Sequence, residues 1–163
     1  GPSRSQSYLR NLDPPQPERA VLGVAYRYDN YMTFAPFQVM QASHRFFAGT
    51  GLANGDVIGA SGLNGGGASG WEMDTSIAGT AAAGVIVGAN SAGDDRGEPP
   101  AGTLLLARGT NTGPEGAFGA DMTVYETSAG GFVFAAGSIS FGGSLVVDPT
   151  LQRILRNVLD ECL

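Results

Sequence analysis

Residues 120–139, ADMTVYETSAGGFVFAAGSI, decide the fold class because they predict two strands joined by a hairpin. Ala120–Thr127 and Gly131–Ile139 are rich in the β-branched and aromatic residues that favour strands. The turn between them, Ser128–Gly131, carries two glycines, which adopt the positive φ angles of short hairpin turns. Two neighbouring antiparallel strands are therefore expected here.

Further strands are predicted on the N-terminal side of this hairpin. Thr103–Arg108 is expected to lie beside it, and Ala20–Tyr28 has the same strand-favouring composition. Trp71–Ile77 and Gly84–Gly88 predict two shorter strands, whereas Val39–Phe47 fits either a strand or a helix.

A helix is predicted at the C-terminal end. Asp148 is a good N-cap residue and Pro149 suits the first helical position. Apolar residues recur after them at helical spacing and predict a stripe packed on the sheet: Leu151, Ile154, Leu155, Val158, Leu159 and Cys162. On such a stripe the Cys162 thiol is expected to be inert packing.

Together these elements predict an α/β or α+β, β-rich fold: a mixed sheet with Gly-rich loops and a C-terminal amphipathic helix. The 163 residues include 26 glycines and nine prolines, which indicates many turns. We expect a single domain over residues 20–163, preceded by an extended lead-in over residues 1–19. Gly1-Pro2-Ser3 resembles the remnant of an engineered protease site.

The net charge, the lengths of the apolar runs and the counts of histidine and cysteine exclude several classes of partner and of metal site. The net charge is −6, from fifteen carboxylates and nine arginines without a lysine, so nucleic acid is not an expected partner. The longest apolar runs, such as Phe132–Ala136, are far shorter than a membrane span. One cysteine allows no internal disulfide and fits a cytoplasmic protein. One histidine and one cysteine do not supply a structural zinc site, and we expect no cofactor held by this chain.

Three residues are candidates for catalysis. Glu72 and Asp74 occupy alternate positions of a predicted strand, so both carboxylates are expected on one face, with Trp71 and Met73 on the opposite, buried face. Mutual repulsion and partial burial are able to raise one carboxyl pKa into the working range of a general acid or base. The alternative is two solvated carboxylates. His44 is the third candidate, although a lone histidine is more often structural.

Several short motifs occur in a characteristic order along the chain. They are Phe47-Ala-Gly-Thr-Gly-Leu52 with Gly55-Asp56, Trp71-Glu-Met-Asp74, Ala120-Asp-Met-Thr-Val-Tyr-Glu126, Gly131-Phe-Val-Phe-Ala-Ala-Gly-Ser138 and Asn157-Val-Leu159. This ordered set resembles the C-terminal region of the N,N-dimethylformamidase large (beta) subunit family, over about residues 21–159.

The resemblance implies a partial flavodoxin-like or class I glutamine-amidotransferase-like sheet. It also implies a hydrolase that opens small, non-peptide amide C–N bonds at an iron held by tyrosines and a carboxylate. Those ligands lie upstream in the family, so iron is expected only in a full-length protein, and an upstream domain of the same polypeptide is the expected partner. Glu72 matches a position near the family's iron site. The chain is expected to be catalytically incomplete alone.

Two other interpretations remain open. A binding or assembly module on the same scaffold would use aromatic loops such as Tyr26–Phe37 to hold a partner or small ligand. A carbohydrate-binding β-sandwich would also explain the aromatic loops, but the C-terminal helix argues against it. If the domain folds on its own, an incomplete sheet edge must be covered by the lead-in arm, by loops or by another copy of the chain, so self-association is one expected outcome.

Overall fold

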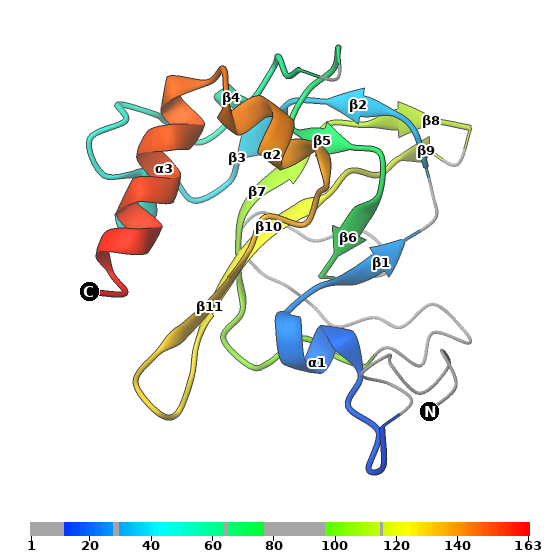
Figure 1. Ribbon diagram of the computed structural model, residues 1–163, viewed down its shortest axis with the longest axis vertical. Helices are drawn as coiled ribbons and strands as arrows, with labels where there is room; N and C mark the ends of the chain where they lie inside the picture. The colour runs from blue at the N-terminus through cyan, green and yellow to red at the C-terminus, as the bar shows by residue number, and fades with distance from the viewer. Residues whose placement is uncertain (1–11, 28–29, 64, 77–96, 115) are drawn as a thin grey trace.

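A five-stranded antiparallel sheet forms the centre of the computed structural model, which describes residues 12–27, 30–63, 65–76, 97–114 and 116–163 (Figure 1). Its strand order is β11-β10-β7-β3-β4. The strands are β3 (Phe37–Val39), β4 (Val57–Ile58), β7 (Leu104–Gly109), β10 (Asp121–Glu126) and β11 (Phe132–Ala135). β10 and β11 form a hairpin whose turn points away from α2, β2 and β4 at the other end of the molecule (Figure 1).

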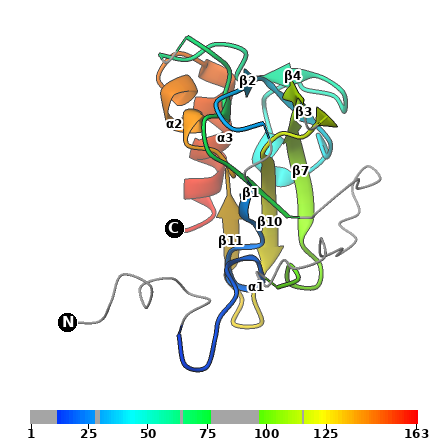
Figure 2. The ribbon, with the colours of Figure 1, turned by 90° about the vertical axis from the view of Figure 1, so that its right-hand side faces the viewer.

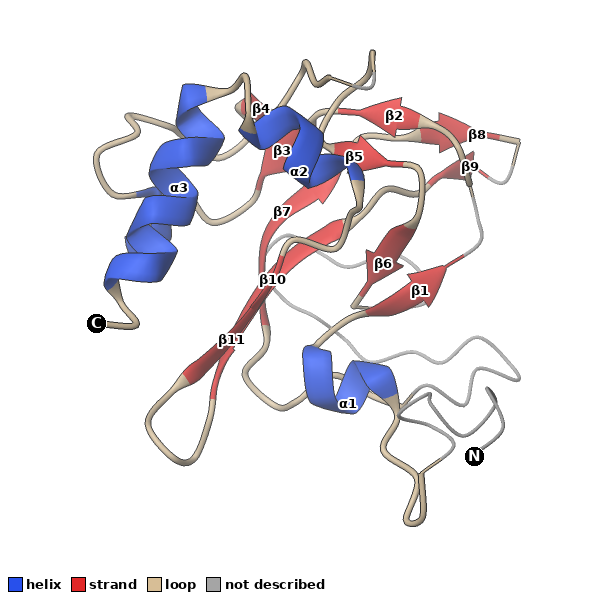
Figure 3. Ribbon diagram, in the orientation of Figure 1, coloured by secondary structure: helices blue, strands red, loops and turns tan. Residues whose placement is uncertain are grey.

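In the described ranges, three small antiparallel sheets lie to the right of the central one in Figure 3. They pair β1 (Ala25–Arg27) with β6 (Met73–Thr75), β2 (Phe34–Ala35) with β5 (Ser69–Gly70), and β8 (Thr112–Gly113) with β9 (Gly116–Ala117). An isolated bridge joins Met73 of β6 to Ser138, just beyond β11. The small sheet of β1 and β6 is thereby attached to the edge of the central sheet.

The predicted hairpin is confirmed, with Val124 opposite Phe134 and Tyr125 opposite Val133, but its second strand ends at Ala135 and not at the predicted Ile139. The strand predicted at Thr103–Arg108 is also confirmed as β7, which pairs with β10. The prediction for Ala20–Tyr28 is wrong in its first half, because Glu18–Leu22 forms the short helix α1. Gly23, at φ 78°, ends this helix in the left-handed region before β1 begins.

The ambiguous segment Val39–Phe47 divides between two structures. Val39 ends β3, and Arg45–Phe47 forms the 3-10 helix η3. The strand predicted over residues 84–88 and most of the predicted lead-in lie outside the described residues.

The C-terminal helix α3 (Pro149–Asp160) begins as predicted. The Asp148 side chain accepts hydrogen bonds from two backbone N–H groups of the first turn, at 2.8 and 3.1 Å. Leu151, Ile154 and Val158 are buried, but Leu159 is 56% exposed and Cys162 is exposed. The stripe was predicted too wide and too long, because Val158 of the last turn packs in the core while its neighbour Leu159 does not, and the helix ends at Asp160 before Cys162.

The core lies between the central sheet and the helical layer. Figure 2 shows α2 (Ser140–Leu145) and α3 together on one side of β7 and β10. Phe46 of η3 is fully buried and its ring contacts those of Phe132 and Phe134 on β11. The Asn157 side chain donates to the carbonyls of Phe46 and Ala48, so α3 and η3 are fixed to one another.

The architecture is a strand-rich α+β domain with open sheets and few helices. Every strand pair in the described ranges is antiparallel, so this part of the chain does not form the mixed sheet that the sequence favoured. No helix among the described residues is long and apolar enough to span a membrane.

Candidate functional site

Glu72 and Asp74 line the same pocket, which has a volume of about 360 Å³. One part of its lining is a continuous run, residues 133–139, made of β11 and the chain that follows it. The remainder comes from Leu22 at the end of α1, from Val24, and from the two carboxylate residues at β6. The pocket is therefore mostly apolar, and its acidic groups come from β6.

Backbone hydrogen bonds fix β6 against this run of residues. The Asp74 N–H donates to the Gly137 carbonyl at 2.7 Å, and the Ile139 N–H donates to the Glu72 carbonyl at 3.3 Å. The Ser138 hydroxyl also bonds both backbone groups of Gly70, at 2.9 and 3.1 Å. These contacts hold the backbone of both acidic residues in one orientation relative to the pocket.

A buried ionic network lies directly behind this wall. The Asp121 carboxylate is fully buried and accepts hydrogen bonds from the Ser76 N–H at 2.9 Å and the Ser76 hydroxyl at 2.6 Å. It also binds the Arg108 guanidinium, at 2.6 and 3.1 Å. Gly137, at φ 67°, lies against the Asp121 carbonyl, where a Cβ atom would collide with it. Asp121 thus joins the end of β6 to the central sheet and positions the pocket wall.

The predicted alternation of side chains holds for part of the segment. Met73 is buried as expected, at 2% exposure, while Glu72 is exposed and Asp74 is half-buried. Trp71 is 39% exposed, so its predicted burial is wrong. Its φ angle of 64° is left-handed, and the extended backbone that produces alternation begins only at Met73.

His44 lies apart from this pocket and is not among its lining residues. It precedes η3, where its Nδ1 atom accepts a hydrogen bond from the Phe46 N–H at 3.3 Å. Its ring also packs edge-on against the Phe46 ring. Burial lowers the pKa of His44 below its ordinary value and the Arg45 charge lowers it further, against the opposing effects of Glu126 and Glu161. This environment favours the neutral, capping form of the imidazole.

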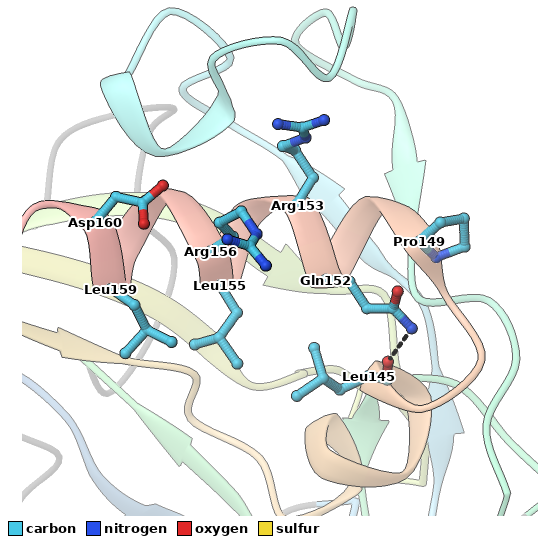
Figure 4. Close-up of a pocket in the computed structure, with 8 residues that line it drawn as sticks. All are labelled: Leu145, Pro149, Gln152, Arg153, Leu155, Arg156, Leu159 and Asp160. Atoms are coloured by element: carbon cyan, nitrogen blue, oxygen red, sulfur yellow. Dashed lines mark hydrogen bonds between the residues drawn. The ribbon is translucent and has the colours of Figure 1, made fainter.

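A second concave surface runs along α3, with a volume of about 530 Å³ (Figure 4). Its lining combines the aliphatic side chains of Leu145, Leu155 and Leu159 with the charged groups of Arg153 and Arg156. Figure 4 shows the three leucines pointing to one side of the helix and the Arg153 side chain to the other. Its acidic member is Asp160, so the groove is more basic than the chain as a whole.

Sequence reasoning missed the role of residues 133–139 as a pocket wall, because a strand's neighbours are set by the sheet order. It also missed Asp121, whose position within a strand of buried residues was the available signal. In the part of the chain that the structure describes, no group of three or more His, Cys, Asp or Glu side chains is placed to hold a metal ion.

Comparison with known families identifies one match. The model of a family described as "N,N-dimethylformamidase beta subunit-like, C-terminal" matches residues 2–153. A search of curated proteins found no match. The matched range includes both carboxylates of the pocket and the whole central sheet.

Proposed function

We propose, because the chain belongs to the N,N-dimethylformamidase beta subunit-like, C-terminal family, that it is the hydrolase-associated C-terminal module of an amidase-like enzyme. Such an enzyme hydrolyses non-peptide C–N bonds. In this proposal the module is catalytically incomplete alone and works with an upstream domain of the same polypeptide. The position of Glu72 at a pocket, on a backbone fixed by hydrogen bonds, is the observation that carries the proposal.

Glu72 is the residue we assign to proton handling. Its carboxylate is exposed, so it is accessible to a substrate held between this module and an upstream domain. A carboxylate in such a position is able to accept a proton from attacking water or to deliver one to a leaving amine. Asp74 lines the same pocket and adds negative charge beside Glu72. We leave His44 outside the catalytic set, because its Nδ1 atom is used in capping η3.

The residues of this pocket do not fit the iron centre implied by the family resemblance. Its acidic members are Glu72 and Asp74, and the other lining side chains are aliphatic, aromatic or Ser138. Two carboxylates without a third protein ligand do not make a closed mononuclear site. We therefore assign the iron to the upstream part of the polypeptide.

The test compares the isolated chain with the full-length polypeptide. Formamide, acetamide and dimethylformamide are supplied, and release of ammonia or amine is measured with and without added iron. The isolated chain is expected to give no turnover. In the full-length protein, Glu72→Gln is expected to lower kcat by about 10² to 10⁴, the usual contribution of a general acid or base.

Glu98→Gln is the matched control, since Glu98 is exposed and is not among the residues that line the pocket. It is expected to leave turnover unchanged. Full activity of the Glu72→Gln enzyme would refute the assigned role of Glu72. Turnover by the isolated chain that Glu72→Gln abolishes would instead show that the module is catalytically complete.

A second candidate function is a binding or assembly module on the same scaffold. The observation that favours it is the outer edge of β11, which runs along the pocket and pairs with no strand in the described ranges. Exposed aromatic and apolar side chains near β1 and β2, among them Tyr26, Tyr31 and Met32, add to the accessible surface. Both candidate functions use the same pocket. A turnover assay tests the catalytic function, and a binding assay tests the other.

A further inference from the structure

The outer edge of β11 presents backbone hydrogen-bonding groups that pair with no strand in the described ranges. At the hairpin turn the Thr127 N–H donates to the Gly131 carbonyl at 2.7 Å. Because hydrogen-bonded and non-hydrogen-bonded pairs alternate in an antiparallel ladder, the next bonded pairs are Tyr125–Val133 and Thr123–Ala135. The N–H and C=O groups of the residues between them therefore point away from β10. These outward-facing residues are Phe132 and Phe134, and the same alternation is expected to turn the N–H of Ala136, the residue after β11, to that side.

The sequence of this edge lacks two of the features that protect edge strands, charged side chains and proline. Residues 131–137, GFVFAAG, contain no charged residue and no proline. Each residue from 132 to 136 is only partly buried. An uncharged edge of this kind is a template on which another extended segment is able to pair.

One strand of the chain, β6, already pairs with the residues that follow β11. β6 meets the end of the run through the Met73–Ser138 bridge and the hydrogen bonds of Gly137 and Ile139. It then leaves the edge, since Ser76 turns to the buried Asp121 carboxylate. Before Gly137 the edge pairs with no strand among the described residues and lines the pocket together with Leu22 and Val24 of the α1–β1 connection. The open length is thus a groove of about 360 Å³ beside the outer edge of β11, whose other edge pairs with β10.

The charge of the groove selects its occupant. Its charged lining residues are both acidic, with Glu72 exposed at the end where β6 meets the run. An added strand from a second copy would bring another Glu72 into the assembly, whereas a strand that carries arginine or lysine would neutralise the carboxylate. We propose that the groove binds an extended, basic peptide segment of a separate protein chain, which adds as a strand to the open edge of β11. The proposal rests on the binding-module candidate.

Binding is tested with fluorescently labelled peptides and the purified chain. A peptide of alternating valine and arginine is expected to bind more tightly than one of alternating valine and glutamate, and increasing salt is expected to weaken it. Ala136→Pro removes one outward N–H and places a ring in its path, so binding of the basic peptide is expected to fall about tenfold. Ala136→Ser, which keeps the N–H, is the matched control and is expected to bind like the parent chain.

Glu72→Gln is expected to reduce the preference for the basic peptide without abolishing strand addition, and it does not alter the strand itself. Equal binding of the two peptides, or equal binding by the proline and serine variants, would overturn the proposal. Sedimentation showing a dimer that Ala136→Pro dissolves would also overturn it, because a second copy would then fill the edge. The assay reads binding without hydrolysis, so its failure is separate from a failure of the catalytic assignment.

Discussion

Leu151→Ala tests how far α3 stabilises the fold. Leu151 is fully buried in the core cluster, whereas Leu159 on the same helix is 56% exposed. Leu159→Ala is therefore the matched control, because it makes the same change on the same helix without removing a buried side chain. A difference between the two variants isolates the contribution of burial.

The structure sets the expected magnitude. Truncation of a fully buried leucine to alanine costs about 2 to 5 kcal/mol, and the cost is greater where the surroundings cannot fill the space. The Gly59 backbone lies close to Leu151 and is held there by a 2.8 Å hydrogen bond from its N–H to the Asp148 carboxylate. This anchored loop limits collapse into the cavity, which favours the upper part of the range.

Thermal unfolding followed by circular dichroism measures the difference. For a domain of this length each kcal/mol lowers Tm by about 2 to 4 °C, so Leu151→Ala is expected to lower Tm by about 4 to 20 °C. Leu159→Ala is expected to change stability by less than about 0.5 kcal/mol. Equal melting temperatures for the two variants would refute the packing of α3 on its own sheet.

Two further predictions concern charged groups. Because the folded-state pKa of His44 is lowered, its stabilising neutral form is fully present above about pH 6.5 and is lost as pH falls through the lowered pKa. His44→Asn keeps an acceptor for the Phe46 N–H and is expected to flatten this part of the Tm-against-pH curve; an unchanged acid slope would contradict the assignment. Asp121→Ala leaves the Arg108 guanidinium and Ser76 N–H without their acceptor, and urea unfolding is expected to show a loss of about 3 to 5 kcal/mol, the usual cost of breaking a buried pair. Arg153→Ala, on the exposed face of α3, is its control, and a loss as small as in that control would exclude a structural role for the pair.

Local signals were sufficient to predict the elements whose determinants are local. The hairpin turn at Ser128–Gly131 and the Asp148–Pro149 helix start each depend on a few adjacent residues. Prediction failed where one backbone angle interrupts a pattern. Gly23 ends α1 within a segment of strand-like composition, and Trp71 begins a run that becomes extended only at Met73.

The candidate site was predictable only in part for a different reason. Glu72 and Asp74 reach the same pocket as predicted because they lie two residues apart in one short segment, although the strand itself begins only at Met73. The other wall of that pocket lies more than fifty residues later in the chain, and nothing within the sequence of β11 distinguishes an edge strand from an inner one. That distinction follows from the sheet order.

The same sheet order connects the two functions proposed for the pocket. β6 is held at one end by Gly137 and Ile139 and at the other by Asp121. It therefore pairs with the residues that follow β11 but not with the outer edge of β11 itself. Had β6 continued along the edge, the outward groups of Phe134 and Ala136 would be paired and the groove filled. Because it turns inward at Ser76, the carboxylate of Glu72 and an open strand edge occupy one surface. A segment that pairs with β11 would therefore lie beside Glu72, and whatever docks at this edge controls access to the carboxylate that we assign to proton handling.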